Sequence, residues 1–156
     1  MGAAKSTVGP LLAERLAWRF IDLDDRVAEH LGLSIPEIFE RQGEEHFRVY
    51  EHQILQECLE GPRESILSLG GGALDREENR ELLRGHHLIW LDAPPELLYA
   101  RADAAGRPLA QQGKNAFLGR YLRRAPLYRE LARYRIDVTG KTPDDVVDQI
   151  MARDEA

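Results

Sequence analysis

A short stretch at the start of the chain carries side chains suited to phosphate chemistry. Residues 2–7 read Gly-Ala-Ala-Lys-Ser-Thr and run directly into a helical pattern. In a loop of the form G-x-x-x-x-G-K-[ST], backbone N–H groups at a helix start surround phosphates, the lysine neutralises their charge, and the hydroxyl binds magnesium. Lys5 and Ser6 fit the last pair, whereas Ala4 stands in place of the last glycine. The alternative is an exposed helix start without a ligand.

Carboxylates follow the next apolar run. Residues 19–22 predict a short strand, and Asp22 and Asp24 stand at its end. Alternate residues of a strand point to the same side. One carboxylate could therefore hold the water shell of Mg²⁺, while the other accepts a hydrogen bond from a hydroxyl group. The alternative is a solvated helix N-terminus, where Asp is favoured in any case.

Three glycines follow a second predicted strand. Gly70, Gly71 and Gly72 come directly after the apolar run 65–69. Without side chains, this edge of a sheet would let a ligand touch the backbone. A tight turn is the alternative, but a turn rarely needs three glycines.

Arginines supply the remaining candidates. Arg48 lies on a predicted helix one turn before Glu51, Arg107 lies in a polar loop over residues 106–115, and Arg124 belongs to an arginine-rich helical stretch. A guanidinium group can hold a planar carboxylate at two points. The alternative for such a stretch is a solvated helix face.

The elements that must position these residues alternate along the chain. Short apolar runs at 19–22, 65–69, 87–91 and 135–138 predict strands. Helical patterns are expected over 5–17 and 44–59 and after start signals at Ser34, Asp75, Pro94 and Thr142, with a break at Gly43. Strands alternating with helices predict an α/β domain with a parallel sheet. The polar loop over residues 106–115 has a length that is usually found at functional sites.

Composition narrows the function classes. The chain has 156 residues, with 21 Lys+Arg against 27 Asp+Glu and a net charge of −6, which argues against a general nucleic-acid binder. The length suits one domain over 1–156. No apolar run approaches the roughly 20 residues of a membrane span, and residues 1–5 do not read as a signal peptide. The single Cys58, expected on a helix facing the core, favours a cytoplasmic protein. The histidines are interpreted as structural or surface residues that bind no zinc: His30, His46, His52, His86 and His87.

Taken in order, the motifs resemble those of shikimate kinase, the small P-loop kinase of chorismate and aromatic amino-acid biosynthesis. The resemblance covers essentially the whole chain, and the ordered set is specific although no single motif is. The matching stretches are Gly-Ala-Ala-Lys-Ser-Thr-Val-Gly (2–9), Phe-Ile-Asp-Leu-Asp (20–24), Ser-Ile-Pro-Glu-Ile-Phe (34–39), Gly-Glu-Glu-His-Phe-Arg (43–48), Gly-Gly-Gly-Ala (70–73), Arg-Pro-Leu (107–109) and Arg-Ala-Pro-Leu-Tyr (124–128).

The resemblance implies transfer of the γ-phosphoryl group of ATP to the 3-hydroxyl of shikimate, with Mg²⁺, by a monomer. It implies that Lys5, Asp24 and Arg107 act in catalysis, and that Ser6 and, through water, Asp22 hold the metal. The implied shikimate-binding residues are Asp24, Arg48, Gly70, Gly71, Gly72 and Arg124. The implied nucleotide-binding residues are Gly2, Ala3, Ala4, Lys5, Ser6, Thr7, Arg101, Arg107 and Pro143. A lid would span about 105–118.

The implied fold is a three-layer α/β/α domain with a parallel sheet in the order 2-3-1-4-5. The first strand and the first P-loop glycine have no counterpart in this chain, which we interpret as a shortened amino end. The flanking strands are then expected to expose unpaired edges. If Ala4 needs a positive φ, its methyl group costs about 1–2 kcal/mol. Pro10 falls inside the first helix and is expected to disturb it.

Two other functions remain open at this point. The altered P-loop favours a non-catalytic domain that binds a small carboxylate and reports it to a partner. An enzyme is favoured by the retained site residues, because a pure sensor has less need of the magnesium-binding aspartate and the lid arginine. These residues are Asp22, Asp24, Arg48, Gly70, Gly71, Gly72, Arg107 and Arg124. Another small-molecule kinase, such as a gluconate kinase, would share the P-loop but would not obviously need the three glycines with Arg48 and Arg124.

Overall fold

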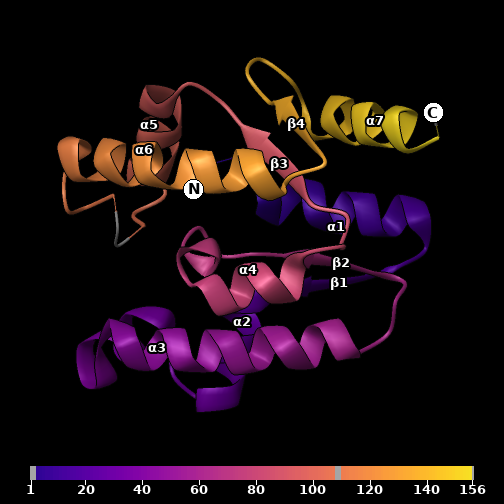
Figure 1. Cartoon of the computed structure of the whole chain (residues 1–156). Helices are drawn as coiled ribbons and strands as arrows, with labels where there is room; N and C mark the ends of the chain where they lie inside the picture. Colours follow the sequence, from indigo (N-terminus) through magenta and orange to yellow (C-terminus); the bar gives the residue numbers. More distant parts are fainter. Residues whose placement is uncertain (1–2, 108–109, 156) are drawn as a thin grey trace.

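The computed structural model describes residues 3–107 and 110–155 and has the predicted α/β architecture with parallel strands. All four predicted strands are present: the first has its predicted range, and the other three have ends displaced by one or two residues (Figure 1). Within the described residues the elements are α1 (Lys5–Leu16), β1 (Arg19–Asp22), α2 (Leu23–Leu31), α3 (Ile35–Glu60), β2 (Ser65–Ser68), the 3₁₀ turn η1 (Ala73–Asp75), α4 (Glu77–Leu83), β3 (Ile89–Asp92), α5 (Pro95–Ala104), α6 (Lys114–Leu131), β4 (Tyr134–Asp137) and α7 (Pro143–Asp154).

The strands form two separate parallel pairs across the described ranges. β1 pairs with β2, from Arg19 opposite Ser65, and β3 pairs with β4, from Ile89 opposite Tyr134. A cavity of about 930 Å³ is lined by residues of β2 and β3 and by the inner face of α1. The facing edges of β2 and β3 thus lack a ladder partner among the described residues, as the sequence predicted for these two strands.

Each half of the molecule packs around its own hydrophobic cluster. The lower half in Figure 1 packs α2, α3 and α4 around β1 and β2, through residues such as Leu23, Ile38 and Leu55. The upper half joins α5, α6 and α7 to β3 and β4, with Phe117 and Ile136 fully buried. α1 contributes apolar side chains to the upper cluster and also contacts β1 and β2, so it bridges the two halves.

Several helix ends are fixed by the signals visible in the sequence. Ser34 forms the predicted capping box, in which the Glu37 N–H donates to Ser34 Oγ (3.3 Å) and the Ser34 N–H donates to Glu37 Oε2 (2.9 Å). Thr142 and Asp145 cap α7 in the same way. At Gly43, φ is 83°, which interrupts α3 as predicted. Only glycine adopts this conformation readily.

Other expectations were wrong in detail. Asp75 does not begin a helix; it ends η1, and α4 starts after Arg76. The polar loop predicted over 106–115 ends earlier, because α6 begins at Lys114; residues 108–109, which the predicted lid includes, lie outside the described residues. Pro10 lies inside α1, which nevertheless continues to Leu16. Cys58 is only half-buried on α3, beside the lower cluster.

Candidate active site

The amino end of α1 begins with a residue in the left-handed conformation. Ala4 caps the helix with φ 62° and ψ 24°, and its carbonyl accepts from the Val8 N–H at 2.9 Å. The condition set by the sequence, a positive φ at this alanine, is therefore met. α1 directs its first free N–H groups outward, where the helix dipole favours an anion. Ser6 and Thr7 are exposed on this first turn and Ala3 is buried, whereas Gly2 lies outside the described residues.

Lys5 lies between groups from both sides of the site. Burial lowers the pKa of its ammonium group from the usual value, and the positive charge of Arg107 lowers it further. The negative charges of Asp24 and Asp22 oppose this shift. Lys5 is thus a cation close to a second cation, an arrangement that a polyanionic ligand would relieve.

The two carboxylates after β1 come together for a different reason than the one predicted. They do not alternate along a strand, because Asp24 lies in the first turn of α2. Asp22 caps α2 by accepting from the Asp25 N–H at 3.2 Å, which is the alternative that the sequence left open. The pKa of Asp24 is raised, first by burial and then by the negative charge of Asp22, while Lys5 and Arg48 lower it.

The glycine run is needed for space. A Cβ at Gly70 would lie 2.7 Å from Asp24 Oδ1, and a Cβ at Gly72 would lie 2.3 Å from Arg48 Nη2. Such separations are too short for any side chain, so glycine allows Asp24 and Arg48 to approach the backbone. The Gly71 carbonyl accepts a hydrogen bond from the Tyr128 hydroxyl.

Arg48 is held rigidly on α3. Its Nη1 donates to both carboxylate oxygens of Glu51, at 2.9 and 3.0 Å, and its Nη2 donates to Glu44 at 3.3 Å. Glu51 is fully buried. Burial raises the pKa of Glu51, and the Arg48 charge opposes that shift. Burial also acts against the charge of Arg48, but Glu51 and Glu44 together outweigh it, and the pKa of Arg48 is raised.

Arg124 reaches the same region from α6. Its Nε donates to Asp75 Oδ1 at 3.1 Å and its Nη2 to Asp75 Oδ2 at 2.9 Å. One turn later, burial raises the pKa of Tyr128 to about 12, with the Arg124 charge acting in the opposite direction. The charges of both Arg124 and Arg48 act on this phenol, so the predicted pair of arginines does converge near Gly71.

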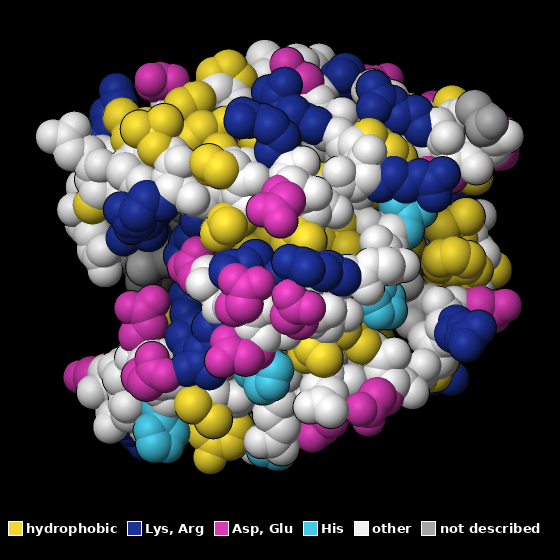
Figure 2. Space-filling model, viewed as in Figure 1, with side chains coloured by type: hydrophobic (Ala, Val, Ile, Leu, Met, Phe, Trp, Pro, Cys, Tyr) yellow, Lys and Arg dark blue, Asp and Glu magenta, His cyan; other side chains and the backbone are white. Residues whose placement is uncertain are grey.

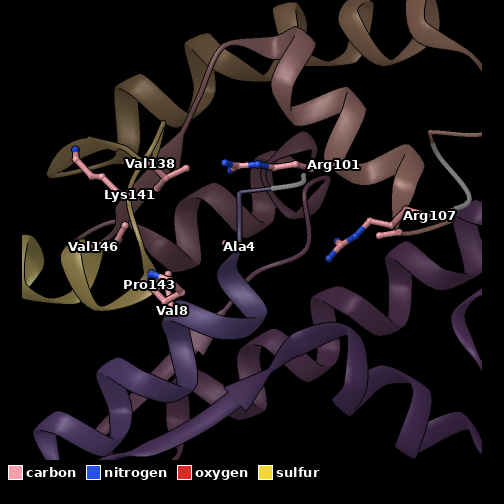
Figure 3. Close-up of a pocket in the computed structure, with 9 residues that line it drawn as sticks. Ala4, Val8, Arg101, Arg107, Val138, Lys141, Pro143 and Val146 are labelled. Carbon is pink, nitrogen blue, oxygen red and sulfur yellow. The ribbon is translucent and has the colours of Figure 1, made fainter.

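A separate cavity of about 240 Å³ lies beside the amino end of α1. It is lined by Ala4, Arg101, Arg107 and Pro143, four residues predicted for nucleotide binding, together with Val8, Ala105, Val138, Lys141 and Val146. In Figure 3, Arg101 extends toward Val138, and Arg107 points toward the start of α1. On the molecular surface, a recess opens between the lower and upper halves, with basic and acidic side chains at its rim (Figure 2).

Comparison with known proteins agrees with this geometry. The family model for shikimate kinase matches residues 1–155. The chain belongs to the shikimate kinase family. It is 39% identical over 155 residues to a shikimate kinase of Rhodococcus jostii, covering 97% of this chain and 92% of that protein. It is 42% identical to one from a Synechococcus strain, covering 97% and 78%. The activity is accordingly that of a shikimate kinase, a phosphotransferase of the shikimate pathway.

Solved shikimate kinases share the fold. The structure from Acinetobacter baumannii, in complex with shikimate, matches with a TM-score of 0.91 at 36% identity, over 98% of this chain and 87% of that one. The structure from Aquifex aeolicus matches with a TM-score of 0.87 at 32% identity, over 99% and 92%. In the part of the chain that is described, no helix is long and apolar enough to cross a membrane.

Sequence reasoning missed several partners of these family residues. Glu51 follows Arg48 by three residues, but this spacing alone did not predict that Glu51 would hold the Arg48 guanidinium in place. Asp75 read as a helix start, and nothing local indicated that it would pair with Arg124, 49 positions away. Lys141 and Val138 enter the smaller cavity from the loop and strand end before α7, a placement that depends on tertiary folding.

Proposed function

We propose that this chain transfers the γ-phosphoryl group of ATP to the 3-hydroxyl of shikimate. ATP would occupy the 240 Å³ cavity and the amino end of α1. Shikimate would lie against Asp24, Arg48, Arg124 and the glycines of residues 70–72. The observation that carries the proposal is the position of Lys5, whose pKa responds both to Arg107 on the nucleotide side and to Asp24 on the substrate side.

Asp24 is suited to receive a proton in this reaction. The 3-hydroxyl oxygen would form a bond to the γ-phosphorus while the bond from that phosphorus to the β-phosphate oxygen breaks, and ADP leaves. The hydroxyl proton would pass to the Asp24 carboxylate, whose raised pKa makes it a better base. Lys5 and Arg107 would stabilise the charge on the phosphoryl oxygens, since positioning and electrostatics carry most of this chemistry.

The rest of the nucleotide would be held by backbone and side chains around α1. Backbone groups of Ala3, Ala4 and Thr7 would face the phosphates. Arg101 and Pro143 would border the adenine, as both line the smaller cavity. Arg107 lies three residues after the end of α5 and lines the same cavity, so its charge would act on the phosphates.

The residues present suit a magnesium ion carried by ATP. Among the described residues, no group of three His, Cys, Asp or Glu side chains could hold a metal by itself. Mg²⁺ commonly keeps several waters and takes only one or two protein ligands beside phosphate oxygens. The Ser6 hydroxyl and, through water, the Asp22 carboxylate would be those ligands, and the ion would neutralise phosphate charge.

The shikimate side offers complementary groups for a carboxylate with hydroxyls. Arg48 and Arg124 would hold the carboxylate, and Asp24 would accept from hydroxyl groups. Backbone groups of Gly71 and Gly72 would approach the ring. An unpaired polar group in a closed pocket costs about 1–3 kcal/mol. Gluconate also carries a carboxylate and hydroxyl groups, so the preference for shikimate rests on the family match and not on these groups alone.

We also propose a finer description of the fold. β1, β2, β3 and β4 would occupy positions 2, 3, 4 and 5 of a sheet ordered 2-3-1-4-5, and the 930 Å³ cavity would correspond to position 1. An apolar five-residue extension ahead of Met1, combined with Ala4→Gly, should raise ATP affinity by filling that position. Unchanged ATP affinity would argue against the assignment of this cavity to strand position 1.

We further propose that the protein is a single domain over 1–156, a monomer and cytoplasmic.

The decisive experiment is ADP release by the 156-residue chain from ATP and Mg²⁺, with and without shikimate and with gluconate as the comparison. Shikimate-dependent release is expected. Gluconate-dependent ADP release would indicate a kinase that acts on a sugar acid. Shikimate binding without ADP release would favour the sensor alternative, which the left-handed Ala4 at the phosphate loop makes physically reasonable.

A further inference from the structure

The two arginines expected to hold the substrate carboxylate already have carboxylate partners, but these partners differ in burial. Arg48 pairs with Glu51, whose side chain is 0% exposed, at 2.9 Å, and with the exposed Glu44 at the longer distance of 3.3 Å. Arg124 pairs with Asp75, whose side chain is 41% exposed, while that of Arg124 is 6% exposed. Glu51 is thus fixed among protein atoms, whereas Asp75 sits at the boundary between the site and solvent.

Asp75 holds Arg124 in the geometry that a ligand carboxylate would use. The contacts join Nε to Oδ1 at 3.1 Å and Nη2 to Oδ2 at 2.9 Å, a two-point pairing of planar groups. Although its sequence position suggested a helix cap, Asp75 does not act as one, since Arg76 is the residue before α4. Its carboxylate therefore serves Arg124 rather than the backbone of α4.

Asp75 is also tied to the glycine run. It ends η1, and its N–H donates to the Gly72 carbonyl at 3.1 Å. The backbone of Asp75 can stay in place while its side chain rotates toward water. A released carboxylate of this exposure would be hydrated at once. A buried carboxylate such as Glu51, if released, would have neither a partner nor water, at a large cost in free energy.

We propose that Asp75 is an internal competitor for the substrate carboxylate. It satisfies the buried Arg124 charge in the free protein and yields it when shikimate binds. The proposal rests on the proposed function. Because one carboxylate replaces another, the net gain from the Arg124 contact is reduced, and a ligand without a carboxylate cannot make the exchange. Asp75 therefore weakens substrate affinity and strengthens discrimination against neutral analogues.

The test compares Asp75→Ala and the similarly sized Asp75→Asn with the unmodified chain. Calorimetry should show a dissociation constant for shikimate lowered about three- to tenfold in both variants. The free variants should melt at a lower temperature, because Arg124 loses its ion pair with Asp75, and shikimate should raise their melting temperature more than it raises that of the unmodified chain. The kcat should change less than KM.

Two controls separate exchange from general disturbance. Asp75→Glu retains the carboxylate and should keep an affinity near that of the unmodified chain. Asp148→Ala removes a solvent-exposed partner of Arg15 far along the sequence and should leave shikimate binding unchanged. If Asp75→Ala unfolds, the ¹⁵Nε–H signal of Arg124 in the unmodified chain still reports the exchange, and it should shift on adding shikimate.

Weaker or unchanged shikimate binding by folded Asp75 variants would overturn the competitor role, as would an Arg124 signal that shikimate does not move. These results would leave the proposed function intact if the unmodified chain binds shikimate and releases ADP. Absence of shikimate binding by the unmodified chain would overturn both.

Discussion

The two ends of the site treat charge in opposite ways. At the substrate end, Arg48 and Arg124 are paired with Glu51 and Asp75 at hydrogen-bonding distance. At the nucleotide end, burial lowers the pKa of Lys5, and the positive charge of nearby Arg107 lowers it further. The first arrangement is stable without a ligand. The second is strained by like charges and is relieved when phosphates arrive.

This difference indicates where each ligand's binding energy goes. A monocarboxylate adds one charge and can exchange with a protein carboxylate, so the substrate end can be organised beforehand. A nucleotide triphosphate brings several charges that no protein group imitates, so the nucleotide end gathers cations and free N–H groups instead. Substitutions at the two ends should therefore separate substrate binding from nucleotide binding and from stability.

The largest expected effect follows from removing Arg124. Arg124→Ala should raise the dissociation constant for shikimate by about 100-fold or more, since truncating one partner of a buried charge pair costs roughly 2–5 kcal/mol. ADP affinity should remain near that of the unmodified chain. Calorimetry with each ligand measures both, and the exposed neighbour Arg123→Ala provides the control. Equal loss of both ligands would show that the two ends are not independent.

Removing the charge of Lys5 tests the nucleotide end of the site. Lys5→Met should lower kcat by about 100- to 1,000-fold, as expected when a group that stabilises transition-state charge is lost. Shikimate affinity should change little. Steady-state kinetics and calorimetry separate the two quantities, and a parallel loss of shikimate binding would place Lys5 in the substrate pocket instead.

The same variant carries a pH prediction. The folded-state pKa of Lys5 is lowered from its usual 10.5, so protonated Lys5 costs stability at neutral pH. This cost begins to fall as pH rises through the folded pKa and is gone only above the unfolded value. Lys5→Met should therefore melt at a higher temperature than the unmodified chain at pH 7, with the difference shrinking toward pH 10. The exposed Lys114→Met should show no such trend. A constant difference would contradict the assigned burial of charge.

A smaller effect is expected from the glycine run. Gly72→Ala places a Cβ 2.3 Å from Arg48 Nη2, so the guanidinium must move. Overpacking of this kind costs about 1–3 kcal/mol, and KM for shikimate should rise by about tenfold. Gly119→Ala, where the nearest side-chain atom would be 3.6 Å away, should leave KM unchanged. An unchanged KM for Gly72→Ala would mean that Arg48 does not contact the substrate.

The sequence predicted most of what depends on local chemistry. The caps at Ser34 and Thr142, the break at Gly43 and the four strands follow from short-range rules. Strand ends were displaced because apolar runs do not mark where pairing stops. The pairing of Arg124 with Asp75 was out of reach, because a carboxylate before acidic residues is an equally good cap signal and only the tertiary fold selects its partner. Asp24 was predicted beside Asp22 from strand alternation, whereas a helix turn brings them together.

The smallest expected effect isolates the backbone of the nucleotide end. Two alanines among the described residues have left-handed conformations, Ala4 with φ 62° before α1 and Ala17 with φ 56° after it. Replacing either with glycine should relieve about 1 kcal/mol of strain and raise the melting temperature by roughly 2–4 °C. Ala4→Gly should also tighten ADP binding, because the methyl group stands where phosphates approach, while Ala17→Gly should stabilise without changing it. If both variants changed ADP affinity equally, the gain would come from the stability of α1 and not from the phosphate loop.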